Sequence, residues 1–171
     1  MPYKVIYIMG VAGSGKTTIG NALSAKTGYN FFDADNFHPQ KNIDKMSNGI
    51  PLTEGDRLPW LENIHAFAKE KIITQTILIA CSALKEKYRN ILSNGMEEQC
   101  CWVFLKGDYE IISQRMQARA GHFMKADMLQ SQFDILEIPE NAIEVDITKT
   151  TEIIIEEIIS QLNLAALKAG S

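Results

Sequence analysis

One eight-residue segment constrains what this chain can fold into more than any other feature of its sequence. Residues 10–17 read GVAGSGKT and fit the pattern G-x-x-x-x-G-K-[ST]. Residues 3–9 are apolar and β-branched and predict a buried strand before it, while residues 17–27 predict a helix after it. Glycines in such a turn let successive backbone N–H groups face phosphate oxygens, and the helix adds the positive end of its dipole. The segment is therefore predicted to bind nucleotide phosphates.

Two side chains of this loop have expected tasks. Lys16 is a point charge for the β- and γ-phosphates of ATP, and the Thr17 hydroxyl is a ligand for Mg²⁺. The alternative is a plain glycine-rich turn, which the predicted strand and helix on either side disfavour. The residues expected to bind ATP here are Gly10, Val11, Ala12, Gly13, Ser14, Gly15, Lys16, Thr17 and Thr18.

The remainder of the chain alternates short apolar stretches with amphipathic ones. Further strands are predicted over residues 30–35, 76–81, 100–105 and 143–147. Further helices are predicted over residues 40–47, 60–74, 85–92, 108–119, 126–136 and 151–167. Such alternation predicts an α/β fold with a parallel sheet, whose ligands bind at the carboxyl ends of the strands. No linker-like stretch divides the sequence, so one domain is expected over residues 1–171.

Composition argues against several classes of protein. A net charge of −4 and a pI of about 5.4 disfavour a nucleic-acid-binding protein, which needs an excess of Lys and Arg. The apolar run at the N-terminus is too short to cross a bilayer, so no membrane association is expected. Three cysteines, two of them adjacent at Cys100 and Cys101, do not suit a disulfide framework. A reducing, cytoplasmic setting is expected.

Two carboxylates end the second predicted strand. Asp33 and Asp35 point the same way if the chain stays extended, because side chains alternate along a strand. One would then hold Mg²⁺ through its water, and the other would accept a proton from an attacking hydroxyl. The alternative is that they cap the next helix. His38 precedes Pro39, which favours an extended backbone, and either bonds a polyol or packs the turn.

Several cations lie near the expected sheet edge. Arg57 suits a bidentate pair with a substrate carboxylate, or alternatively an ion pair with Asp56 or Glu54. Arg115 and Arg119 are four residues apart on one helix face and suit a clamp on one ligand, although charges at this spacing usually form a solvated face.

The segment after Arg119 contains Gly121, as expected for a lid closing over ATP. Ser82 directly follows the third predicted strand, where a polar contact to substrate is expected.

The type of nucleotide enzyme can be narrowed by missing motifs. The sequence lacks the N-K-x-D motif that reads guanine, and Thr18 stands where a dinucleotide-binding turn has its third Gly or Ala. A phosphotransferase that uses ATP remains the simplest reading. A nucleotide-dependent switch module is the alternative from another class, and a kinase of nucleic-acid ends is disfavoured by the charge.

With these residues identified, the chain resembles the gluconokinases, a family of P-loop carbohydrate kinases. The combination of segments is specific, whereas the phosphate loop alone is shared by many families. Ala12 and Ala34 depart from the common pattern, which has Ser and Gly there. The resemblance rests on residues 9–17, 33–39, 42–46, 49–52, 56–61, 81–85, 88–89, 105–107, 121–123 and 131–133.

The resemblance implies a three-layer α/β/α fold with sheet order 2-3-1-4-5 and a mobile lid at roughly residues 119–133. It implies transfer of the ATP γ-phosphate to the C6 hydroxyl of D-gluconate, with Mg²⁺ and often in a homodimer. A related kinase acting on another sugar acid or on shikimate is the alternative.

Site residues are also implied by the resemblance. The catalytic residues would be Lys16, Asp35 and Arg119, and Asp33 would join Thr17 at the metal. Arg115 and Arg119 would serve ATP. The residues implied to bind gluconate are Asp35, His38, Lys45, Arg57, Ser82, Lys85 and Arg89.

Overall fold

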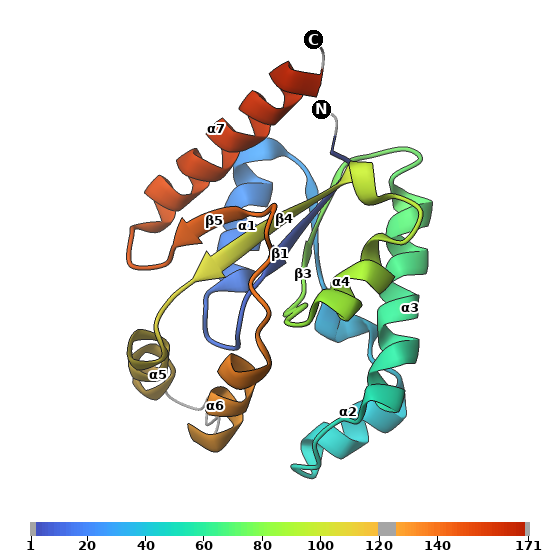
Figure 1. Cartoon of the computed structure of the whole chain (residues 1–171), viewed down its shortest axis with the longest axis vertical. Coiled ribbons are helices and arrows are strands. Elements are labelled where there is room, and N and C mark those ends of the chain that lie inside the picture. The colour runs from blue at the N-terminus through green and yellow to red at the C-terminus, as the bar shows by residue number, and fades with distance from the viewer. Residues whose placement is uncertain (1–2, 120–125, 170–171) are drawn as a thin grey trace.

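Five parallel strands form the centre of the computed structural model, which describes residues 3–119 and 126–169 (Figure 1). Their spatial order is β2-β3-β1-β4-β5, and every neighbouring pair is parallel. The predicted α/β class and strand order are therefore confirmed. The strands are β1 (Val5–Met9), β2 (Asn30–Asp33), β3 (Ile77–Ala80), β4 (Cys100–Lys106) and β5 (Ile143–Asp146).

Helices cover both faces of this sheet because its buried strands are apolar on both sides. In β1, Ile6 and Ile8 belong to one apolar cluster, whereas Tyr7 belongs to the cluster on the opposite face. Helices α1 (Lys16–Thr27) and α7 (Thr151–Ala169) pack on the first face. Helices α3 (Glu54–Lys71) and α4 (Glu86–Ser93) pack on the second. The predicted three layers are thus observed.

The remaining helices flank the carboxyl ends of the strands. Helix α2 (Gln40–Ser47) precedes α3, and α5 (Tyr109–Ala118) and α6 (Ala126–Ile135) lie together below the other edge of the sheet in Figure 1. Short 3₁₀ turns occur at η1 (Ala34–Phe37) and η2 (Glu97–Gln99). Within the described ranges, no helix is long and apolar enough to span a membrane.

The second strand is shorter than its predicted range of 30–35. It ends at Asp33, whose Oδ1 accepts the backbone N–H of Asp35 at 2.9 Å and so starts the 3₁₀ turn. The expectation that both carboxylates point the same way from an extended strand is therefore wrong. The Asp33 side chain accepts a backbone N–H two residues later, and this local hydrogen bond ends the strand, as Asp side chains commonly do.

The third helix begins six residues before the predicted start at residue 60. Thr53 and Asp56 form a reciprocal capping box, with the Asp56 N–H donating to Thr53 Oγ1 at 3.1 Å and the Thr53 N–H donating to Asp56 Oδ2 at 2.9 Å. Pro59 therefore lies inside the helix, not at its entrance. Pro59 is the sixth residue of α3, so its missing N–H leaves the carbonyl of Gly55 without its usual helical donor.

The predicted lid over residues 119–133 falls only partly within the described structure. Arg119 is the C-cap of α5, and α6 includes the end of the predicted lid. Residues 120–125 lie outside the described residues, so the lid remains a prediction.

Candidate active site

The phosphate-binding loop connects β1 to α1, as its sequence pattern predicts. Gly13 and Gly15 have φ values of 76° and 99°, in the left-handed region that side chains disfavour. A Cβ on Gly13 would also lie 2.6 Å from Met116 Cγ of α5. Lys16 Nζ donates to the carbonyls of Gly10 and Val11, at 3.0 Å each. The loop thus curls around the lysine; Gly13 is required by both its backbone conformation and the space beside it, and Gly15 by its backbone conformation.

Two opposing effects act on the pKa of the Lys16 ammonium group. Burial lowers the pKa of Lys16, while the carboxylates of Asp35 and Asp33 act in the other direction. A cation held in a partly desolvated loop exerts a stronger field on an incoming phosphate than one in water. This arrangement suits the charge stabilisation that phosphoryl transfer requires.

Thr17 and Asp33 supply oxygen atoms beside the loop. The Thr17 hydroxyl donates to Asp33 Oδ2 at 3.3 Å. Among the described residues, no group of three or more His, Cys, Asp or Glu side chains forms a metal cluster. Mg²⁺ prefers oxygen ligands and commonly takes only one or two from protein, with phosphates and water completing its shell. The two side chains therefore fit Mg²⁺ bound together with a nucleotide.

Asp35 lies just beyond β2, close to the phosphate loop. Burial and the neighbouring Asp33 carboxylate raise the pKa of Asp35, while His38 and Lys16 oppose this shift. A carboxylate with a raised pKa is a better proton acceptor than an ordinary aspartate, provided that it is ionised at the working pH. Asp35 thus has the position and electrostatics of a general base.

A cavity of about 350 Å³ opens beside α1. It contains Ser14, Gly15 and Thr18 of the phosphate-loop region, Arg115 and Arg119 from the end of α5, and Lys149 from the turn after β5. Arg115 Nη2 donates to the carbonyl of Ile147 at 2.6 Å, which ties α5 to that turn. Both predicted arginines and Thr18 are therefore brought together around one cavity, next to the phosphate loop.

Sequence reasoning missed the contribution of the turn after β5. Ile147, Lys149 and Thr151 also line the cavity. Their signal was available, because the turn follows a predicted strand at the carboxyl edge of the sheet, where ligands bind.

A second missed contact joins α6 to the phosphate loop. Gln132 Oε1 accepts the backbone N–H of Ala12 at 2.7 Å, across 120 residues of sequence. Gln132 carried no assigned role in the sequence, and local patterns give no signal for so distant a pairing. One of the loop amides is thus held by a side chain.

The acceptor side of the site is lined by cations from α2, α3 and α4. Lys45 Nζ pairs with Asp56 Oδ2 at 2.7 Å, and Lys85 Nζ pairs with Glu54 Oε1 at 3.1 Å. Arg57 has no ion pair among the described residues, and its guanidinium carbon lies 5.9 Å from the ring centre of Tyr88. The alternative pairing of Arg57 with its acidic neighbours is therefore not observed.

Arg89 is more buried than a surface ligand-binding arginine. Its Nη1 donates to the carbonyls of Ala83 at 2.8 Å and Leu84 at 3.2 Å, and its Nη2 donates to the carbonyl of Glu137 at 2.9 Å. Ala83 has a φ of 45°, so the guanidinium supports a strained turn directly after Ser82. A role for Arg89 in binding substrate stays a prediction, and its observed contacts are structural.

The order of the strands determines where the predicted nucleotide-binding and acceptor-binding residues lie in the sheet. Asp35 and His38, which are predicted to bind the acceptor, follow β2 at one edge of the sheet, and Lys149 follows β5 at the other edge. The phosphate loop follows the central strand β1. The residues predicted to bind the nucleotide and the acceptor therefore lie toward opposite edges of the sheet, with Lys16 after the central strand between them.

Comparisons with known proteins agree with this arrangement. The family model described as shikimate kinase matches residues 12–163. The chain is 41% identical over 177 residues to a probable gluconokinase of Xenopus tropicalis, and this match covers 93% of this chain and 93% of that one. It is 50% identical over 144 residues to the thermosensitive gluconokinase of Escherichia coli strain K12, which covers 83% of this chain and 75% of that one.

Solved structures include one that is similar over almost the whole chain. The crystal structure of a gluconokinase from Sinorhizobium meliloti 1021 superposes with a TM-score of 0.87 at 37% identity, over 98% of this chain and 95% of that one. The shikimate kinase of Aquifex aeolicus, at 18% identity and a TM-score of 0.58, shares the fold. From its sheet order, its phosphate loop and these identities, the chain belongs to the gluconokinase family of shikimate kinase-like P-loop kinases.

Proposed function

We propose that this protein is a gluconokinase, which transfers the γ-phosphate of ATP to the C6 hydroxyl of D-gluconate and forms 6-phospho-D-gluconate and ADP. The observation that carries the proposal is the contact between the phosphate loop and the end of β2, where the Thr17 hydroxyl donates to Asp33 Oδ2 at 3.3 Å, two residues before Asp35, in a chain that is 41% identical to a probable gluconokinase over almost its full length. A base beside a phosphate-binding lysine is what transfer to a hydroxyl requires.

In the proposed reaction, Asp35 accepts the proton of the C6 hydroxyl while that oxygen bonds to the γ-phosphorus. The bond between the γ-phosphorus and the bridging oxygen breaks, and ADP leaves with that oxygen. Lys16, together with Arg119 at the end of α5, neutralises charge on the transferred group. Thr17 and Asp33 are proposed to hold Mg²⁺, which supplies further neutralisation and alignment of the phosphates.

Gluconate is proposed to lie between the end of β2 and helices α2 to α4. Arg57 is the best-placed partner for its carboxylate, because its guanidinium is free of ion pairs within the described structure. A guanidinium matches a carboxylate through two parallel hydrogen bonds. The other residues proposed to contact the polyol are His38, Lys45, Ser82, Lys85 and Arg89.

The proposal extends to assembly and setting. A homodimer is expected from the resemblance to the family, and light scattering on the purified protein would test it. A cytoplasmic location is proposed because the three described cysteines are free thiols.

An acceptor panel tests the function directly. ADP release would be measured with Mg-ATP and, in turn, D-gluconate, other aldonates, shikimate, AMP and no acceptor. Strong stimulation by D-gluconate alone is expected. If shikimate or another aldonate stimulates ADP release instead, the assignment of D-gluconate as the substrate is wrong, and the assignment of the protein as a kinase stands. ATP binding without stimulation by any acceptor would overturn the kinase and favour a nucleotide-dependent switch.

A further inference from the structure

His38 has a fixed ring plane at the entrance to the acceptor side. Its imidazole stacks on the indole of Trp60, with ring centres 4.2 Å apart and planes 12° from parallel. Trp60 Nε1 in turn donates to the carbonyl of Ala34 at 2.8 Å. The ring is thus locked to the turn that contains Asp35. What remains to be decided is which of its two nitrogens carries the proton.

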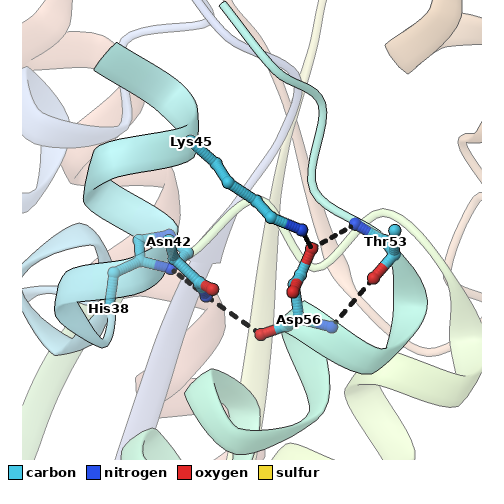
Figure 2. A network of polar contacts seen from close by, with 5 residues as sticks. All are labelled: His38, Asn42, Lys45, Thr53 and Asp56. Carbon is cyan, nitrogen blue, oxygen red and sulfur yellow. Dashed lines mark hydrogen bonds and ion pairs between the residues drawn. The ribbon is translucent and has the colours of Figure 1, made fainter. Parts of the chain in front are cut away.

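Asn42 of α2 faces one of these nitrogens from a fully buried position. Its Nδ2 donates to the backbone carbonyl of Asp56 at 2.9 Å and lies 3.2 Å from His38 Nδ1, as Figure 2 shows. Its Oδ1 is buried with no hydrogen-bond partner in the part of the chain that the structure describes. Leaving a buried acceptor unpaired is costly, so the orientation of this amide needs a reason.

The carbonyl of Asp56 supplies that reason. If the Asn42 amide were turned over, Oδ1 would face the Asp56 carbonyl oxygen, and two acceptors would be in contact. The Asp56 carbonyl is itself held in place, because the capping box with Thr53 and the ion pair with Lys45 fix the first turn of α3 (Figure 2). The amide nitrogen is therefore the group that faces His38 Nδ1.

An N–H that points at His38 Nδ1 requires that nitrogen to accept. A neutral imidazole has one donor and one acceptor nitrogen, so the proton must then lie on Nε2. The charged groups that face the ring are Asp35 and Arg57. Burial is the largest influence on the ring and lowers the pKa of His38, which favours the neutral form at neutral pH.

We propose that Asn42 is a positioning residue that holds His38 as the neutral Nε2–H tautomer, so that His38 offers a hydrogen-bond donor to a hydroxyl oxygen of the acceptor polyol. The identity of that acceptor rests on the proposed function. A substrate hydroxyl can then accept from His38 while another donates to Asp35, so that His38 does not act as a second base. Among the described residues, Nε2 has no partner that competes with the substrate.

The tautomer can be measured without any assay of activity. Long-range ¹H–¹⁵N spectra of the uniformly labelled protein distinguish the two neutral tautomers and the imidazolium. His65 provides an internal contrast, because its Nδ1 lies 3.1 Å from the carbonyl of Leu92 and must donate. His38→Gln and His65→Gln variants assign the signals. At neutral pH we expect Nε2–H for His38 and Nδ1–H for His65. An Nδ1–H or doubly protonated His38 would overturn the proposal.

A substitution at Asn42 tests the consequence for substrate. The carboxylate of Asn42→Asp can only accept a hydrogen bond, so it should convert His38 to the neutral Nδ1–H form, whose Nε2 no longer donates. The KM for the acceptor should then rise roughly tenfold, as for the loss of one hydrogen bond, with the KM for ATP unchanged. Asn48→Asp is the matched control, because Asn48 Nδ2 also donates to a backbone carbonyl, that of Asp44, but on an exposed part of α2.

The outcomes separate this inference from the proposed function. A neutral Nδ1–H His38 in Asn42→Asp without a change in the KM for the acceptor would overturn the role of His38 as a donor. An imidazolium in this variant keeps Nε2–H, so a raised KM in that form would overturn it as well. If Asn42→Asp does not fold, the spectrum of the unsubstituted protein decides on its own. If D-gluconate is not phosphorylated but the tautomers are as expected, the proposed substrate fails and the positioning by Asn42 stands.

Discussion

Asp33 and Asp35 are two residues apart and have different environments, so their roles should separate on substitution. Asp33 is committed to the Thr17 hydroxyl and to the N–H of Asp35, whereas burial and Asp33 raise the pKa of Asp35. Asp35→Asn should lower kcat by a factor of about 10² to 10⁴, the usual contribution of a general base, with the Kd for ATP unchanged. Asp33→Asn should instead raise the Mg²⁺ concentration needed for half-maximal activity. Unchanged turnover in Asp35→Asn would remove it from the role of base.

Residue types alone indicated much of this site, but not how its residues are paired. The phosphate loop was predicted in full, because its chemistry depends on a contiguous pattern. Lys45 and Lys85 were expected to contact substrate, and in the structure they pair with Asp56 and Glu54, which lie 11 and 31 residues away. Such pairings depend on tertiary packing, which no local spacing encodes.

At the scale of elements, the start of α3 makes stability depend on pH. Hydrogen bonds from Lys45 and the Thr53 backbone hold the pKa of Asp56 well below its usual range. In the unfolded chain this pKa is about 3.9, so the stabilisation is complete above that value and is lost as the pH falls toward the folded pKa. Asp56→Asn should therefore be less stable than the parent protein at pH 7, with a difference that narrows as the pH falls below about 4.

Urea denaturation at several pH values checks this prediction. Lys45→Met should give a similar pH-dependent loss, because it removes the largest cause of the lowered pKa of Asp56. A stability difference that is constant across the acid range would contradict the assignment of the effect to this carboxylate.

The contact between α6 and the phosphate loop leads to a prediction about nucleotide affinity. Gln132 Oε1 occupies the N–H of Ala12, an amide that a bound phosphate is expected to use. Gln132→Ala removes this competitor, so the Kd for ATP should fall by about two- to tenfold, the range for one net hydrogen bond. Gln130→Ala is the matched control, because Gln130 bonds Asp134 within α6 at 2.8 Å. Weaker ATP binding in Gln132→Ala would show that the contact supports the loop, and isothermal titration distinguishes the two results.

Element boundaries show where local patterns lose to specific interactions. The helix predicted from residue 60 begins at Glu54, because Thr53 and Asp56 cap it there. The second strand was extended to Asp35, although the Asp33 side chain ends it. In both cases a polar side chain that bonds the backbone decided the boundary, and the apolar periodicity used for the predictions does not register such bonds.

For the whole molecule, the strand order β2-β3-β1-β4-β5 places the residues proposed for the acceptor and for the nucleotide toward opposite edges of the sheet. Acceptor residues follow the outer strand β2, and part of the nucleotide cavity follows the outer strand β5. Substitutions at the two edges should therefore weaken the binding of different ligands. A pair of variants tests this separation: Arg57→Ala at the acceptor edge and Lys149→Ala at the nucleotide edge.

Arg57→Ala should raise the KM for D-gluconate at least tenfold, because a charged hydrogen-bonded pair is lost, and should leave the rise in Tm caused by ATP unchanged. Lys149→Ala should reduce that rise and increase the KM for ATP, with the KM for D-gluconate unaffected. Its exposed ion pair with Glu157 contributes little stability, so loss of the fold does not confound the result. If both variants change the KM for D-gluconate and the KM for ATP to the same extent, the two edges are not independent. Closure of the molecule around the two substrates must then couple them.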